Sequence, residues 1–206
     1  VVATFPQNQV LSSLNQYRAA AGVTSTGLTN TYTSSTTSVC DITSGANLSL
    51  KTVGTCTIVA SQGANSPNFL AADSVTVSFQ ITTGQIITFG TLPTKTYGDP
   101  TFDLSATASS GLTVSFALTT GSGTCSLTGV TVTILGAGSC SFTASQSGNG
   151  SYSAATPVVQ GLTINKKALT FTATAANKTY DGVDTATLTL SALTGIINSD
   201  AVSIDA

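Results

Sequence analysis

Hydrophobic and polar side chains alternate along much of this chain with a period of two residues. Residues 74–81 show the pattern most clearly, because Val, Phe or Ile occupies every second position and Ser, Thr or Gln lies between them. Residues 48–50 and 130–134 alternate in the same way. A period of two is typical of half-buried β-strands. Short strands separated by turns such as TTG, LGAG and SGNG predict a β-sandwich.

One segment near the start of the chain lacks this alternation. Residues 9–22, QVLSSLNQYRAAAG, are rich in Ala and place Val10, Leu14 and Tyr17 near helical spacing. Because the segment precedes the first clear strands, we expect it to supply the opening strands of the first sandwich. A short helix is the alternative.

The strand pattern is repeated along the chain. GTCTIVASQGAN begins at Gly54, and GSCSFTASQSGN begins 84 residues later at Gly138 (138 − 54). The same spacing separates Gly27, in STGLTNTY, from Gly111, in SSGLTVSF. This period is longer than the roughly 20–50 residues of solenoid repeats. It favours successive small domains, each with its own core.

The register continues into a third stretch of the chain, because KTYGD at 95–99 is followed by KTYDG at 178–182. We therefore predict a first repeat at residues 1–83, a second repeat at 84–166, and a third segment, a partial module, at 167–206. In the third segment the pattern predicts strands at Leu169–Ala173 and Thr185–Leu193. Two or three strands cannot bury a full core alone.

Four cysteines lie at matching places in the two repeats: Cys40, Cys56, Cys125 and Cys140. Each is in phase with hydrophobic neighbours on its strand, so all four should point inward. Pairing Cys40 with Cys56 and Cys125 with Cys140 closes one loop in each repeat, whereas separate cores would hold other pairs too far apart. Disulfides imply an oxidising, extracellular compartment. The alternatives are free buried thiols or a four-thiolate metal site.

Composition excludes several classes of protein. Hydrophobic residues make up 41% of the 206 residues but charged residues only 7%, well below the ~25% of an average domain. No stretch is apolar enough for a membrane-spanning helix, and a net charge of −2 offers no track for nucleic acid. The chain has no Met, so we expect a mature or excised piece of a protein.

The second repeat resembles a known family. QIITFGTLPTKTYGDPTFDLSATASSGLTVSF and GSCSFTASQSGNGSYSAA, within residues 85–155, are similar to the MBG-type bacterial Ig-like repeat. Residues 27–81 resemble the second half of that repeat, and residues 167–206 resemble the first half of the related YDG-type repeat. The resemblance implies Ig-like domains. Together with the strand pattern and the cysteines, it predicts an all-β fold of tandem Ig-like β-sandwich domains, each with an intradomain disulfide, plus a partial third module. It also implies a large secreted adhesin- or haemagglutinin-like bacterial surface protein.

Candidate chemistry is sparse. A hydroxyl nucleophile needs a base, but the chain has neither His nor Glu, so we predict no enzymatic activity and no cofactor. Oxygen-rich calcium sites are a weaker hypothesis. Their candidate ligands are also typical turn-capping residues, which is the favoured interpretation. These candidates are Asp99, Asp103, Asp181 and Asp184.

The two KTY turns are candidate domain-junction elements. Lys95 and Tyr97 form the first, and Lys178 and Tyr180 form the second. We expect each tyrosine to pack at a junction with its hydroxyl hydrogen-bonded. Surface recognition by the tyrosines, or an isopeptide cross-link from one of the lysines, are the alternatives.

Three functions follow in order of preference. The first is an extracellular structural repeat protein, a stalk or fibre segment of the bacterial cell surface. Its partners would be other copies of itself or neighbouring repeats, joined by strand addition. The second is an adhesin module that binds a host protein or glycan through loop residues such as Tyr152. The third, an enzyme, is disfavoured.

Overall fold

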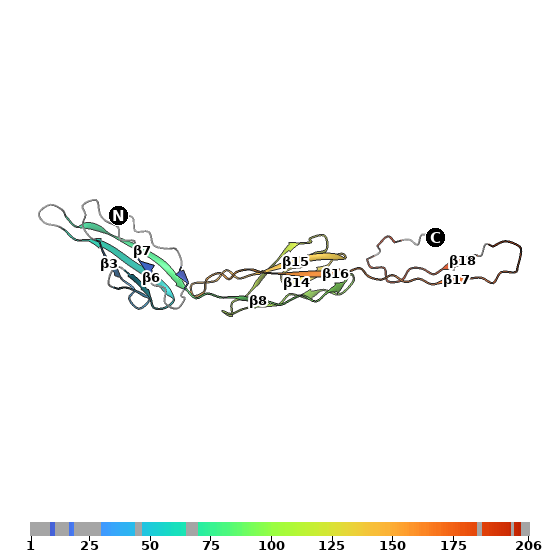
Figure 1. The fold of residues 1–206 in the computed structure, drawn as a ribbon, viewed down its shortest axis with the longest axis horizontal. Coiled ribbons are helices and arrows are strands. Elements are labelled where there is room, and N and C mark those ends of the chain that lie inside the picture. The colour runs from blue at the N-terminus through green and yellow to red at the C-terminus, as the bar shows by residue number, and fades with distance from the viewer. Residues whose placement is uncertain are drawn as a thin grey trace. The chain divides into compact units, whose positions relative to one another are not determined.

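The computed structural model shows an all-β protein (Figure 1). In the residues that it describes, every regular element is a strand, and each of the two repeats holds its own disulfide. The prediction of tandem β-sandwich modules is therefore confirmed. The described residues are 9–10, 17–18, 30–43, 47–64, 70–184, 187–198 and 200–202.

The chain divides into two compact units. Unit 1 consists of Val1–Thr88, Ala106–Ser115 and Ala144–Val158. Unit 2 consists of Phe89–Ser105, Phe116–Thr143 and Val159–Ala206. The predicted domain boundaries at residues 83 and 166 stay a prediction.

The first repeat contributes two sheets to unit 1. One has the order β1-β7-β6-β3, and the other has the order β2-β5-β4. The long strands β6 and β7 run antiparallel side by side, with Cys56 opposite Phe79 (Figure 1). The strands are β1 Gln9–Val10, β2 Tyr17–Arg18, β3 Thr31–Ser34, β4 Cys40–Thr43, β5 Asn47–Leu50, β6 Gly54–Gln62 and β7 Ala72–Thr82.

The core of the first repeat follows the predicted alternation. Alternate residues in the middle of β6 face inward and are buried, namely Cys56, Ile58 and Ala60. The strand prediction for residues 9–22 is confirmed at β1 and β2, and the other residues of that segment lie outside the described ones. The core cluster comprises Tyr32, Cys40, Leu48, Cys56, Ile58, Ala60, Phe79 and Ile81.

The second repeat contributes three sheets. Their orders are β11-β8, β10-β14-β13 and β12-β15-β16-β9. Strands β8 and β11 lie mostly in unit 1, and the others lie wholly or mostly in unit 2. The strands are β8 Ile87–Phe89, β9 Lys95–Thr96, β10 Phe102–Asp103, β11 Ala106–Ala108, β12 Ser115–Thr120, β13 Cys125–Thr128, β14 Thr131–Ile134, β15 Gly138–Ser145 and β16 Val158–Asn165.

The two repeats share their strand pairing. Cys40 lies opposite Leu50 in the β4–β5 hairpin, and Cys125 lies opposite Ile134 in the β13–β14 hairpin. Three residues separate β4 from β5, but only two separate β13 from β14. This one-residue difference in the turn explains why the cysteines are 16 residues apart in the first repeat and 15 in the second.

Two residues predicted to face inward are exposed instead. Val130 lies with Gly129 in the two-residue turn between β13 and β14, so it is outside the strand. Val75 lies in the N-terminal part of β7, where the side chains are exposed because that end of the strand lies outside the core. The alternation is present at both places, but burial also requires an opposing layer.

The third segment forms one hairpin, β17 Ala173–Ala175 with β18 Leu188–Leu190 (Figure 1). The predicted strand Leu169–Ala173 is wrong in its bounds, since β17 begins at Ala173. The isolated bridge between Thr170 and Thr194 is one residue out of register with the β17–β18 ladder, so regular pairing is interrupted before β17. Within the predicted strand Thr185–Leu193, the described residues form strand only at Leu188–Leu190, and Thr185 and Ala186 lie outside the described residues.

Candidate functional site

The four cysteines form the two predicted disulfides. Cys40 is bonded to Cys56 and Cys125 to Cys140, with Cα–Cα distances of 5.6 and 6.2 Å. Both distances lie within the usual range for disulfides. All four side chains are buried and none is free, so no thiolate is left for a metal or a nucleophile.

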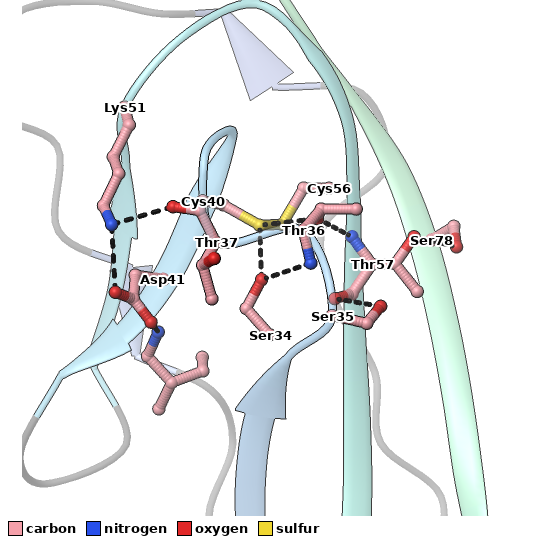
Figure 2. The surroundings of a disulfide bond; sticks show 11 residues. Ser34, Ser35, Thr36, Thr37, Cys40, Asp41, Lys51, Cys56, Thr57 and Ser78 are labelled. Atoms are coloured by element: carbon pink, nitrogen blue, oxygen red, sulfur yellow. Dashed lines mark hydrogen bonds and ion pairs between the residues drawn. A yellow bond between two sulfur atoms is a disulfide. The ribbon is translucent and has the colours of Figure 1, made fainter.

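Hydroxyl groups surround the first disulfide (Figure 2). Ser34 Oγ and Thr36 Oγ1 lie 3.5 and 3.6 Å from Cys40 Sγ. Thr36 Oγ1 also accepts a hydrogen bond of 2.9 Å from the amide of Thr57, one residue beyond Cys56. The disulfide is therefore built into a bonded framework that joins the turn before β4 to β6.

An exposed ion pair between Lys51 and Asp41 lies beside this framework (Figure 2). Lys51 Nζ lies 3.0 Å from Asp41 Oδ2 and donates to the carbonyl of Thr37 at 2.8 Å. The Lys51 hydrogen bond is the main reason that the pKa of Asp41 lies below its ordinary value. Both side chains are exposed, so we expect the pair to add little to stability.

The predicted calcium ligands of the second repeat are engaged with their own turns and strands. Asp99 Oδ2 accepts a hydrogen bond of 2.8 Å from the amide of Thr96, which is a turn-capping contact. Asp103 Oδ1 accepts from Thr131 Oγ1 at 2.6 Å, so it links β10 to β14.

The carboxylates of the third segment show a similar local role. Asp181 accepts hydrogen bonds of 3.0 Å from Lys178 Nζ and from the amide of Val183, and the Lys178 contact is the main cause of a lowered pKa at Asp181. Asp184 is exposed. Within the described part of the chain, no three His, Cys, Asp or Glu side chains are grouped closely enough for a metal ion.

The first KTY turn packs against its surroundings. Lys95 Nζ lies 4.9 Å above the centre of the Phe102 ring, a cation–π contact. The amide of Tyr97 donates to the carbonyl of Asn165 at 2.9 Å. The Tyr97 side chain is half-buried, and its hydroxyl lies 3.5 Å from Asn198 Nδ2.

The second KTY turn differs from the first. Lys178 Nζ donates to the carbonyl of Val183 at 3.0 Å, which closes the turn. The Tyr180 side chain is 95% exposed. The expected packing is therefore absent at Tyr180, and the role of the half-buried Tyr97 at a domain junction stays a prediction.

A buried polar cluster was missed in the sequence. The side chain of Gln85 is only 8% exposed. Its Nε2 donates to Gln146 Oε1 at 2.7 Å and to the carbonyl of Ser153 at 2.6 Å. Its Oε1 accepts from Ser110 Oγ. The signal was present, because Gln146 is the Gln of the repeated ASQ motif, but its partner Gln85 is far away in sequence.

The loop that follows the ASQ motif is held by its own residues. Gln146 Oε1 also accepts from the amide of Gly148, and Asn149 Oδ1 accepts from the amides of Ser151 and Tyr152 at 2.8 and 3.0 Å. Gly148 has a φ of +78°, and a Cβ there would lie 2.3 Å from the carbonyl oxygen of Tyr152. The Gly and Asn of the motif are therefore required by the shape of the loop.

This loop also binds the last residue of the predicted first repeat, Thr83. The amide of Thr83 donates to the carbonyl of Ser151 at 2.7 Å, and the amide of Ser153 donates to the carbonyl of Thr83 at 3.0 Å. Thr83 and Tyr152 form a parallel bridge. The loop of residues 146–153 thus contacts residues 83 and 85, more than sixty positions earlier in the chain.

Comparison with known proteins gives little further information. The chain matches no protein-family model and no curated protein. Among solved structures it is similar to a surface layer protein, SbsC (domains 1–6), with 13% sequence identity and a TM-score of 0.31. That match covers 85% of this chain and 31% of the SbsC chain, so this chain spans about a third of its length. A likeness this low assigns neither a family nor a function.

In the residues described above, there is no helix with the length and apolar character needed to cross a bilayer.

Proposed function

We propose that this chain is an extracellular structural repeat segment, part of a stalk or fibre of a bacterial surface protein. The observation that carries the proposal is that one framework is built twice in succession. Gly54 and Gly138, each two residues before a bonded cysteine, have nearly the same unusual φ of +140° and +143°. Repetition of a whole framework serves length, whereas a binding or catalytic site needs to be built only once.

The chemistry of the two frameworks supports this proposal. Buried disulfides persist in oxidising surroundings, which favours an extracellular location. The described carboxylates Asp41, Asp99 and Asp181 are engaged with lysines or turn amides, so none is arranged as a general base. We propose that the chain has no enzymatic activity.

Location on the cell surface is the direct test. Antibodies raised against this chain should label intact cells of the organism that produces it, and brief protease treatment of those cells should release peptides from residues 84–166. Labelling that requires permeabilised cells would refute the proposal. A cytoplasmic protein of the same organism serves as the control for cell integrity.

We further propose that the third segment assembles by adding its hairpin to a neighbouring sheet. The pairs Ala173–Leu190 and Ala175–Leu188 place apolar side chains on one face of the hairpin, and Thr174–Thr189 lies on the other face. An isolated two-stranded hairpin is marginal in water, so its apolar face favours a covering layer.

Sedimentation of the full chain at increasing concentration tests this assembly. We expect self-association that weakens in a Leu188→Ser variant on the apolar face and persists in a Thr189→Ser variant on the polar face. A chain that stays monomeric at high concentration would contradict assembly between copies, and it would leave the stalk proposal standing.

The second candidate is adhesion, and the nearly complete exposure of Tyr180 favours it. Exposed aromatic side chains are common anchors in binding interfaces. In this case Tyr180→Ala should abolish binding of the chain to host cells or to a glycan array, whereas Tyr97→Phe should preserve it. Absence of binding by the unaltered chain would count against this function.

A further inference from the structure

We propose that Gln85 and the loop of residues 146–153 form a clasp that resists tension on the second repeat. The clasp consists of the hydrogen bonds from Thr83 and Gln85 to that loop and from Ser110 to Gln85. This inference rests on the proposed stalk role, because only a protein pulled along its length needs such resistance.

The position of the clasp follows from two consecutive residues. Thr82 lies opposite Val10 at the end of β7, inside the framework of the first repeat. The next residue, Thr83, is bonded to Ser151 and Ser153 of the second repeat. A pull transmitted along β7 therefore reaches the clasp as soon as it leaves the first repeat.

The strand directions determine how the bonds are loaded. The Thr83–Tyr152 bridge is parallel, and so is the pairing of β9 with β16, in which Thr96 lies opposite Asn165. When one strand of a parallel pair is pulled by its N-terminal end and the other by its C-terminal end, the two strands slide in opposite directions. All bonds between them are then strained at once, whereas an antiparallel pair pulled in this way opens one bond at a time.

Gln85 strengthens the clasp because both ends of its amide are used. The Nε2 atom donates to Gln146 Oε1 and the Ser153 carbonyl, and the Oε1 atom accepts from Ser110 Oγ. The side chain is 8% exposed, so water does not readily replace these partners during a pull. Breaking such bonds leaves buried polar groups unsatisfied, which is costly.

The two glutamines have opposite roles, and this gives a matched pair of variants. Gln85 donates through Nε2, so Gln85→Glu removes the donor and turns a carboxylate oxygen toward two acceptors. Gln146 acts through Oε1 as an acceptor in both of its side-chain bonds, so Gln146→Glu keeps both. The chemical change is the same and nearly isosteric at both positions.

Single-molecule pulling on the full, oxidised chain between its two ends tests the clasp. The unaltered chain should show two main unfolding events, one for each repeat. We expect Gln85→Glu to raise the unfolding rate of one event about 10-fold at a fixed force, which corresponds to the loss of about 1.4 kcal/mol. The other event is an internal control and should not change. Gln146→Glu should leave both events within about 2-fold of the unaltered chain.

A second comparison separates force resistance from general stability. Ile134→Val removes a methyl group from a buried side chain in the core of the second repeat and leaves the residues of the clasp unchanged. We expect Ile134→Val and Gln85→Glu to lower the stability measured in denaturant by similar amounts. Under force, Ile134→Val should raise the unfolding rate less than Gln85→Glu does. If Gln85→Glu does not fold, the same measurement is made on Ser110→Ala. This variant removes one hydrogen bond of the clasp, the bond from Ser110 Oγ to Gln85 Oε1.

Three results would overturn the clasp. These are an unchanged unfolding rate in the Gln85 variant (or in Ser110→Ala, where that replaces it), an equal effect of the Gln146 variant, and an equal effect of Ile134→Val. Any of these results would leave the surface-labelling test of the stalk role untouched. The two proposals can therefore fail separately.

Discussion

The second repeat and the third segment begin with similar sequences but differ in burial. ITF at 87–89 precedes the first KTY turn, and LTF at 169–171 precedes the second. In the second repeat, Ile87 and Phe89 are 8% and 5% exposed. In the third segment, Leu169 and Phe171 are 37% and 51% exposed.

The difference lies in what covers each motif. In the second repeat, β8 pairs with β11, and the Phe89 ring meets the Phe116 ring edge-on with centres 5.4 Å apart. In the described part of the third segment, the strands are only β17 and β18. The motif therefore specifies which side chains are on the inward face of its strand. Whether those side chains are buried depends on the other strands that pack against them.

The largest effect should come from truncating the aromatic residue of each motif. Phe89→Ala should lower the free energy of unfolding by about 3–5 kcal/mol, because a buried ring leaves a cavity. Phe171→Ala should change it by less than about 1 kcal/mol, since the ring is half exposed. Denaturant unfolding of both variants measures the contrast, and equal losses would show that the third segment has a buried core after all.

Removing a disulfide should also affect the repeats and not the third segment. Cys125→Ala with Cys140→Ala opens a loop with a sequence separation of 15, which should cost about 3 kcal/mol. Amide hydrogen exchange should accelerate in β13–β15 and remain unchanged in β17 and β18, where there is no cysteine. Equal acceleration in the hairpin would mean that its stability depends on the second repeat.

Two glycines with nearly the same backbone conformation provide a finer comparison. Gly148 and Gly182 have φ values of +78° and +79°. A Cβ at Gly148 would collide with the Tyr152 carbonyl, but at Gly182 there is open space. Gly182→Ala should cost about 1 kcal/mol for the left-handed conformation alone, and Gly148→Ala about 2 kcal/mol or more. Thermal unfolding of the two variants and hydrogen exchange in the two loops measure this difference. Equal losses of stability would show that the close contact between residue 148 and the Tyr152 carbonyl is unimportant.

The smallest effect concerns the charge on the second KTY turn. The Lys178 hydrogen bond lowers the pKa of Asp181 below 3.8, so the turn gains stability above the unfolded pKa and loses it as the pH falls through the folded pKa. Lys178→Gln should move the Asp181 carboxyl titration to higher pH in an NMR experiment. A titration unmoved by this variant would show that the backbone bond from Val183 dominates.

Much of the fold could be predicted because it depends on local alternation and on repetition. The phase of Cys56 with Ile58, and of Cys140 with Phe142, placed both cysteines in a core. Their pairing within repeats followed from one core per repeat, and the structure confirms it. Strand ends were less predictable. β17 begins at Ala173, where the pairing with β18 shifts register relative to the Thr170–Thr194 bridge. The sequence of one strand gives no information about its register with another strand.

The candidate sites were predicted less well than the fold. Turn-capping by Asp99 could be expected from its place in the KTYGD turn. The clasp could not, because Gln85 and Gln146 are 61 residues apart and neither lies in a motif of known chemistry. Polar contacts over such distances depend on how loops fold back, and the period of a strand carries no information about them.

By itself the sequence determined an all-β chain, two disulfide-stapled repeats and the inward face of each long strand. Side-chain alternation fixes the face of a strand. Each cysteine pairs within its own repeat because separate cores hold cysteines of different repeats too far apart for a disulfide. Only the tertiary structure decided that Tyr97 is half-buried while Tyr180 is exposed, and that Thr83 and Gln85 bind the loop of residues 146–153. Burial and long-range hydrogen bonds are properties of the neighbours that the fold brings to a residue.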